Sequence, residues 1–213
     1  MIRLPANLVV IDCETTGLDA AWHGIVSIGA VALDGSEFHQ ECQPGGEVTD
    51  VDAEALAVCG IADLQALYSR EMAAGPAVLK LCEWLRGLPR AGLARKDKFI
   101  QGGKNPHFDR EFLVRELSRW RRGQTPEDFK EEQTLAGLRK WAENWLPLSR
   151  RPLNVHDWAV VWALRRGIAV DAPGFSVAQV YRQLGFAEEA KPHHALTGAK
   201  LALEKFKKLA EEL

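Results

Sequence analysis

Two acidic residues, Asp12 and Glu14, stand at the end of an apolar run early in the chain. Residues 8–11 form a continuous apolar and mostly β-branched run, which predicts a buried central strand. Because alternate residues of a strand face the same side, both carboxylates are expected on one face. Adjacent carboxylates repel and lose hydration there, and a hard cation such as Mg²⁺ or Mn²⁺ removes both costs. The pattern indicates a metal site, although a strand that simply ends in a polar turn has the same residues.

A third acidic residue, Asp109, stands at the expected start of a helix. Pro106 favours a helix start there, because its fixed φ suits a first helical turn. Phe108, Phe112 and Leu113 would anchor this helix to the sheet and leave Asp109 facing the other way. A helix N-terminus stabilises a carboxylate. An isolated Asp at this position is also typical of an ordinary surface helix.

Two segments together resemble a known family. Asp12-x-Glu14-Thr15-Thr16-Gly17-Leu18 resembles the first motif of the DEDD exonucleases, and residues 105–113 resemble the family's Asn-x-x-Phe-Asp-x-x-Phe-Leu segment. The resemblance implies an α/β fold of the RNase H-like type, with a mixed sheet flanked by helices. It also implies 3′→5′ exonuclease activity with two bound Mg²⁺ or Mn²⁺ ions. It covers nearly the whole chain, so we expect one exonuclease domain over residues 1–213.

The third motif departs from the family pattern. In the His-bearing branch, DEDDh, an Asp follows the catalytic His by five positions, at the start of the last helix. Aligning His193 with that His puts Gly198 where the fourth carboxylate belongs, and aligning His194 instead gives Ala199. We identify His193 as the catalytic His and Gly198 as a lost metal-ligand position. Asp157 is the nearest substitute by chemistry, but its position resembles a helix start elsewhere in the family.

The resemblance assigns a role to each matching residue. Asp12 would bridge both metals, Glu14 would help to hold the first, and Asp109 would act largely through a bound water. His193 would take the proton from the attacking water, since an imidazole with an ordinary pKa of about 6.5 suits that task. The product would be a nucleoside 5′-monophosphate. The residues expected to bind substrate are Thr15, Thr16, Gly17, Leu18, Asn105 and Phe108.

Gly198 also suggests that this enzyme is impaired. Glycine inside a helix costs about 1 kcal/mol relative to alanine, so it has no evident local use there. A metal displaced by about 1 Å can lower a rate on the order of a hundredfold, which predicts a slow or inert enzyme. One alternative is a non-catalytic module that binds single-stranded 3′ ends. Another is a domain that binds metal for stability only, which the turn at Thr15–Leu18 argues against.

The composition limits the partners and the cellular location. The formal net charge of −2 gives no global sign of nucleic-acid binding, so any such surface must be local. The expected partner is a single-stranded DNA or RNA 3′ end, and no motif distinguishes the two. Scattered cysteines, no signal peptide and no membrane-spanning apolar run favour a cytoplasmic protein without a membrane partner. The oligomeric state is left open, with a homodimer as one option.

The order of expected elements favours a mixed α/β layer fold. Three early strands with short turns suggest an antiparallel start. Later segments are mostly helical, with one more strand between them. The expected strands are 8–11, 25–33, 37–43 and 98–101, and the expected helices are 52–58, 61–68, 77–88, one from about 106, 135–145, 155–166, 176–184 and 194–211.

Basic and aromatic residues complete the set of candidates. Candidate phosphate contacts are Lys104, Arg110, Arg150 and Arg151. Solvated faces are the expected place for Arg119, Arg121, Arg122, Lys205, Lys207 and Lys208. Two tryptophan pairs with helical spacing, 141/145 and 158/162, are expected to pack against other elements rather than to stack on bases.

Overall fold

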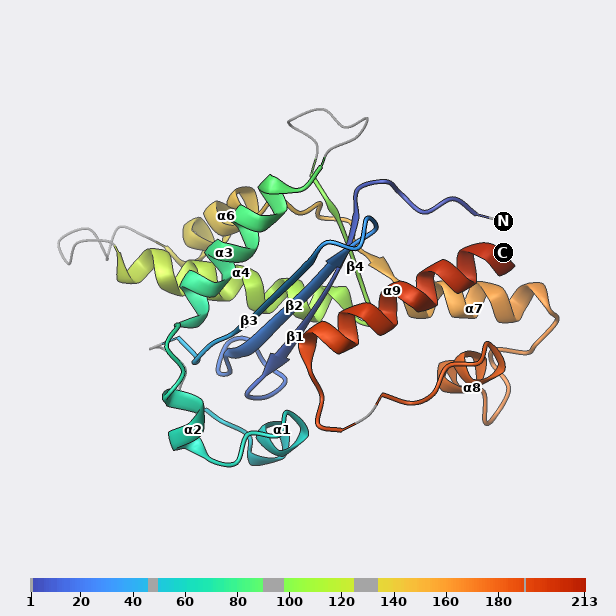
Figure 1. Cartoon of the computed structure of the whole chain (residues 1–213), viewed down its shortest axis with the longest axis horizontal. Helices are drawn as coiled ribbons and strands as arrows, with labels where there is room; N and C mark the ends of the chain where they lie inside the picture. Colours follow the sequence, from blue (N-terminus) through green and yellow to red (C-terminus); the bar gives the residue numbers. More distant parts are fainter. Residues whose placement is uncertain (1, 46–49, 90–97, 125–133, 190) are drawn as a thin grey trace.

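The computed structural model describes residues 2–45, 50–89, 98–124, 134–189 and 191–213. A five-stranded sheet with strand order β3-β2-β1-β4-β5 lies at its centre (Figure 1). β1 pairs antiparallel with β2 and β2 with β3, which confirms the predicted antiparallel start. β4 is parallel to both β1 and β5. The strands are β1 (Leu8–Thr15), β2 (Ile25–Ala32), β3 (Glu37–Glu41), β4 (Ile100–Gly103) and β5 (Leu153–Asn154).

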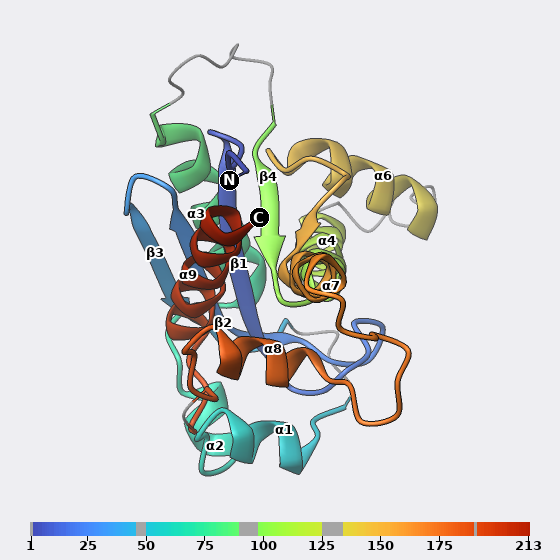
Figure 2. The same cartoon turned by 90° about the vertical axis from the view of Figure 1, so that its right-hand side faces the viewer.

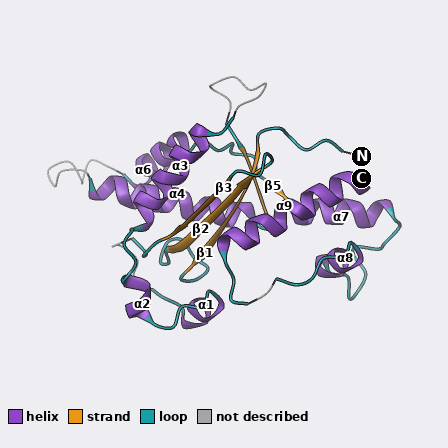
Figure 3. Cartoon of the chain, viewed as in Figure 1, coloured by secondary structure: helices purple, strands orange, loops and turns teal. Residues whose placement is uncertain are grey.

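Helices cover both faces of the sheet (Figure 3). In two perpendicular views, α3, α4 and α6 lie on one side and α7 and α9 on the other, with α1 and α2 beyond one end of the strands (Figure 2). No described helix is both long and apolar enough to cross a membrane. The helices are α1 (Ala53–Val58), α2 (Leu64–Tyr68), α3 (Ala74–Gly87), α4 (Pro106–Gly123), α6 (Leu135–Trp145), α7 (Val155–Arg165), α8 (Val177–Gln183) and α9 (Ala195–Glu212).

The side chains of β1 alternate between two hydrophobic cores. Val9 and Ile11 belong to the core formed with α3, α4 and α6. Val10 belongs to the second core, which includes residues of α7, α8 and α9. Asp12 and Glu14 continue the series of Val10, so the two-residue period of the strand directs both carboxylates toward the side of α9.

The strand bounds differ from the prediction, since β3 ends at Glu41 instead of residue 43 and β4 spans Ile100–Gly103 instead of 98–101. β1 continues beyond Ile11 to Thr15, because its polar end still pairs with β2, with Glu14 opposite Ser27. β5 was not predicted, since two residues are too few to form a pattern. The helix predicted at residues 135–145 is α6, and Ser176 caps α8 through a capping box as expected.

The tryptophan pairs pack against other elements, as predicted. Trp141 stacks between Trp120 and Trp145, with ring centroids 6.5 and 6.1 Å apart. Trp158 meets Phe206 of α9 edge to face at 5.5 Å, and Trp162 is buried. These rings join helices to one another and to the sheet.

β3 forms the outer edge of the described sheet. It pairs with β2 on one side and with no described strand on the other. Glu37, His39 and Glu41 are exposed along it, and Phe38 and Gln40 are half-buried. Glu37 forms an ion pair with Lys200 of α9 at 2.8 Å.

Candidate active site

Asp12 lies among three other acidic side chains at the end of β1. Burial raises its pKa well above the ordinary 3.8, and the charges of Asp109, Glu14 and Glu189 raise it further. Lys104, which follows β4, acts in the opposite direction. Four carboxyl groups therefore share one region, and their mutual repulsion favours binding of a cation.

Asp109 is held against β1 by a backbone hydrogen bond. It lies in the first turn of α4 and is 4% exposed. The amide of Cys13 donates to Asp109 Oδ1 at 2.9 Å. Burial raises the pKa of Asp109 to about 7, although the hydrogen bond from Cys13 opposes the shift. The sequence predicted that this carboxylate faces away from the sheet, which is wrong, because α4 starts where β4 ends, beside β1.

Glu14 and His193 come from opposite ends of the chain and lie near each other. Burial raises the pKa of Glu14, while a hydrogen bond from Cys59 and the charges of His193 and His194 lower it. The thiol of Cys59 donates to Glu14 Oε2 at 3.5 Å. The amide of His193 donates to the carbonyl of Val58 at 2.9 Å, which ties the segment before α9 to the end of α1.

Gly198 faces Asp12 directly. A Cβ placed on Gly198 would overlap Asp12 Oδ2 and would lie 3.1 Å from Glu189 Oε1. Asp157, the substitute considered from the sequence, is exposed on α7, and its charge acts on His156 and Tyr181. Glu189 was not predicted from the sequence, because it lies in a connection between helices that has no periodic pattern.

The turn after β1 combines inward hydroxyl groups with one exposed apolar side chain. Thr15 donates from Oγ1 to Gly17 O at 2.7 Å, and Thr16 Oγ1 donates to Asp50 O at 3.3 Å. Leu18 is 84% exposed. The ring of His23 packs so closely on Gly17 that a Cβ there would overlap it. The hydroxyls thus hold the turn, and Leu18 extends into solvent.

Asn105 and Phe108 differ in their surroundings. Asn105 is exposed and caps α4 without a side-chain hydrogen bond. Phe108 is half-buried and packs on Phe112 with ring centroids 4.8 Å apart. Asn105 is therefore accessible at the end of β4, whereas much of Phe108 packs on its own helix.

Arg119 is buried, which corrects the expectation of a solvated face. It is 6% exposed and pairs with Glu116 at 2.9 Å. Its guanidinium also donates to the carbonyls of Ala20, Ala21 and His23 at 2.9–3.1 Å. Arg119 thereby fixes the segment that follows Leu18. The spacing of an acid and a base three residues apart was the only signal for it in the sequence.

Arg110 is also buried rather than available to a phosphate. It is 9% exposed and donates to Ser149 O at 3.1 Å. Arg150 pairs with Glu143 at 3.1 Å. Lys104 is exposed and close enough to lower the pKa of Asp12, so it is the candidate phosphate contact nearest to the acidic residues.

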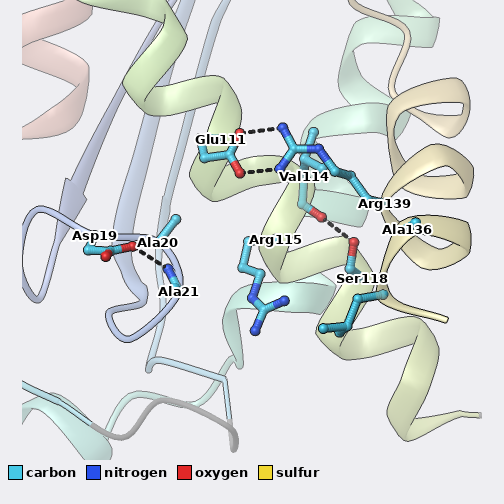
Figure 4. A pocket seen from close by; sticks show the side chains of 10 residues that line it. Asp19, Ala20, Ala21, Glu111, Val114, Arg115, Ser118, Ala136 and Arg139 are labelled. Carbon is cyan, nitrogen blue, oxygen red and sulfur yellow. Dashed lines mark hydrogen bonds and ion pairs between the residues drawn. The ribbon is translucent and has the colours of Figure 1, made fainter.

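A pocket of about 400 Å³ lies apart from these residues, between α4, α6 and the turn after β1 (Figure 4). Glu111 and Arg139 pair in it through two hydrogen bonds, one of them 2.6 Å long. Arg115 and Asp19 also line it. None of the four predicted catalytic residues lines this pocket.

The acidic residues suit a divalent ion in their chemistry. Among the residues that the structure describes, no three His, Cys, Asp or Glu side chains already surround one metal position. The acidic side chains that act on Asp12 nevertheless carry carboxylate oxygens, which Mg²⁺ and Mn²⁺ prefer. Among the described residues, Lys104 is the one cation whose charge clearly lowers the pKa of Asp12. Asp12, Glu14 and Asp109 therefore fit such an ion as donors.

Comparison with known proteins identifies a family for the chain. The model of the RNase T family, described as an exonuclease, matches residues 9–150, a span that includes β1 and α4 but ends before α9. No curated protein matches the chain by sequence.

Solved structures of exonuclease I share the fold. One has a TM-score of 0.63 at 16% identity, and the enzyme from Methylocaldum szegediense has 0.60 at 18%. E. coli exonuclease I in complex with a dA16 oligonucleotide has 0.59 at 16%. Each match covers 96% of this chain but only 40% of the other, so the chain spans about two-fifths of the length of these proteins. The architecture is that of the RNase H-like exonuclease fold.

Proposed function

Because the chain belongs to the RNase T exonuclease family, we propose that it removes nucleotides from the 3′ end of single-stranded nucleic acid by hydrolysis. The observation that carries this proposal is the convergence of Asp12, Glu14 and Asp109 at the end of β1, with His193 beside Glu14. The fold similarity to E. coli exonuclease I, solved with the oligonucleotide dA16, makes single-stranded DNA the first substrate to test.

Each residue has a part in the proposed reaction. Asp12, Glu14 and Asp109 would hold two divalent ions. When bound, such ions would supply stabilisation of the charge that develops on the attacking and leaving oxygens. Water attacks the terminal phosphorus while the bond to the 3′ oxygen breaks, and His193 would accept the proton of the water. The leaving 3′ oxygen takes up a proton from solvent, so the shortened strand ends in a new 3′ hydroxyl, and a nucleoside 5′-monophosphate is released.

The turn after β1 would meet the terminal nucleotide. Leu18 is exposed in this turn and would wedge against the last base. The backbone of Thr15, Thr16 and Gly17 would lie along the nucleotide, since the hydroxyls of both threonines are already bonded within the protein. Asn105, exposed at the end of β4, would contact the strand from the other side, with the apolar face of Phe108 behind it.

A module that binds 3′ ends without cutting them is the second candidate. Gly198 favours it, because α9 presents no carboxylate toward Asp12. The two functions differ in one simple result, since the module would bind a strand and leave its length unchanged.

The test uses 5′-labelled single-stranded DNA and RNA with Mg²⁺ or Mn²⁺. We expect a ladder that shortens from the 3′ end, and no ladder with Asp12→Asn. Asp157→Asn is the matched control, because Asp157 is exposed and its charge acts elsewhere. Early release of the 5′ label as a mononucleotide would contradict the proposed direction. Binding without shortening would establish the module instead.

A further inference from the structure

Helix α9 approaches the sheet closely where it begins, and a glycine on each element allows this. A Cβ on Gly29 of β2 would overlap the backbone of Ala195 and Leu196. A Cβ on Gly198 of α9 would overlap Asp12 Oδ2. No side chain at position 198 therefore fits unless the helix or the Asp12 carboxylate moves.

A carboxylate from another segment reaches the space that Gly198 leaves open. Glu189 lies between α8 and α9 and is half-buried, and its Oε1 is 3.1 Å from the point where a Cβ of Gly198 would stand. Its charge acts on both Asp12 and Glu14. The neighbouring Glu188 is exposed and is not among the main charges acting on either residue. Of these two adjacent glutamates, only Glu189 is directed toward the acidic cluster.

A simpler role for Glu189 would be to neutralise the positive charge of Lys205. Glu189 does raise the pKa of Lys205, but burial and the charge of Lys104 outweigh this and lower it. No ion pair joins Glu189 to Lys205 among the described residues. The Lys205 ammonium lies over the ring of Tyr181 instead, 4.3 Å from its centroid. Neutralisation of Lys205 therefore does not account for the position of Glu189.

We infer that Glu189 supplies, from the segment before α9, the carboxylate ligand that α9 itself lacks. The inference rests on the proposed function, because it adds one oxygen donor to the ions that Asp12 and Glu14 would hold. Glutamate is one methylene longer than aspartate, so it can reach the site from a connecting segment. Gly198 is then a requirement of the site, since it leaves the space in which Glu189 and Asp12 converge.

Titration of Mn²⁺ into the full chain without nucleic acid, followed by calorimetry, tests the inference. Glu189→Gln should weaken the binding of one ion by at least about tenfold, which is the smallest loss usual for residues supporting a metal site. Glu188→Gln is the matched control and should bind as the wild type does. Glu189→Asp keeps the charge but shortens the side chain, so direct ligation predicts weaker binding for it too.

Gly198→Asp gives an independent measurement. It restores an aspartate to the family position, yet we expect it to bind Mn²⁺ no better than the wild type. We also expect it to melt at a lower temperature in EDTA, because its side chain overlaps Asp12. Tighter Mn²⁺ binding and faster cleavage by this variant would overturn the inference and place the fourth ligand on α9.

The remaining outcomes separate the inference from the proposed function. If Glu189→Gln and Glu189→Asp bind Mn²⁺ like the wild type while Asp12→Asn does not, Glu189 is no ligand and the exonuclease proposal stands. If the wild type binds no Mn²⁺ and cuts no strand, the proposed function fails and the inference fails with it. Melting in EDTA shows that each variant is folded before it is titrated.

Discussion

The acidic residues of the site are supported in two different ways. Asp12 and Asp109 lie on β1 and α4, and the amide of Cys13 in β1 holds the Asp109 carboxylate at 2.9 Å. Glu189 lies on a connecting segment, half-buried, and forms no hydrogen bond with a described residue. Regular elements fix a carboxylate through packing and register, whereas a connection can bring one in only if the facing surface leaves room. Gly198 leaves that room.

Asp12→Asn, which changes a carboxylate held by a regular element, should have the largest effect. Cleavage should fall on the order of a thousandfold or more, as for loss of a group that acts together with its neighbours. In EDTA, however, the variant should melt at a higher temperature, because repulsion from Asp109, Glu14 and Glu189 is relieved. Strand-shortening assays and thermal melts measure the two effects. A lower melting temperature in EDTA would contradict the account of mutual repulsion.

Arg119→Met tests how firmly helix α4, another regular element, holds the turn after β1. The change removes three bonds to loop carbonyls and leaves Glu116 buried without its partner. Denaturant unfolding should show a loss of about 3–5 kcal/mol in the free energy of unfolding. Arg122→Met, at an exposed position of the same helix, should change it by less than about 0.5 kcal/mol. Equal effects would mean that Arg119 does not anchor the turn.

Gly198→Ala tests the space between α9 and Asp12, which Glu189 approaches from its connecting segment. Overpacking against Asp12 should cost about 1–3 kcal/mol, more than the gain in helix propensity of about 1 kcal/mol. Gly87→Ala near the end of α3 meets nothing within 4 Å, so there the propensity gain should remain and stabilise the protein. A stabilising Gly198→Ala would show that α9 can retreat from Asp12 at little cost.

The smallest expected effect is on the pH dependence of stability. It involves His156, whose pKa is influenced by a residue after β4 and by a residue on α9. Burial lowers its pKa below 6.5, and so do Lys104 after β4 and Lys205 on α9. The unfolded chain therefore takes up this proton first as the pH falls, and stability is lost below about pH 6.5. Between about pH 7.5 and about pH 5.5, the melting temperature of His156→Gln should fall less than that of the wild type. His39→Gln, at an exposed position, should not differ from the wild type. An unchanged loss in His156→Gln would remove His156 as the cause.

The sequence predicted best those features that repeat along an element. The alternation after Val10 gave the common face of Asp12 and Glu14, and the strand and helix periods gave the antiparallel start and most helices. The motif around Asp109 predicted that this residue lies in a first helical turn. It did not predict where the carboxylate points, because that depends on how α4, which follows β4, lies against β1.

Features that depend on distant contacts were not predictable. The burial of Arg119 depends on three carbonyls almost a hundred residues away in the sequence. Glu189 has no period or motif that distinguishes it from Glu188, and only its side chain's approach to Asp12 does so. Gly198 was predicted from the sequence as a lost ligand position, and its close approach to Asp12 depends on how α9 packs on the sheet, which no pattern in the sequence shows.

The open edge of the sheet limits how this chain can associate with other copies. β3 is only five residues long, and it carries exposed glutamates at both ends. A second β3 placed alongside in the antiparallel sense would bring these carboxylates opposite one another, and like charges facing across strands are destabilising. Lys200 pairs with Glu37 at 2.8 Å and Arg70 with Glu41 at 3.8 Å, so both carboxylates have a cationic partner that reduces this repulsion. The shortness of β3 and its charged side chains still disfavour continuation of the sheet from one molecule into the next.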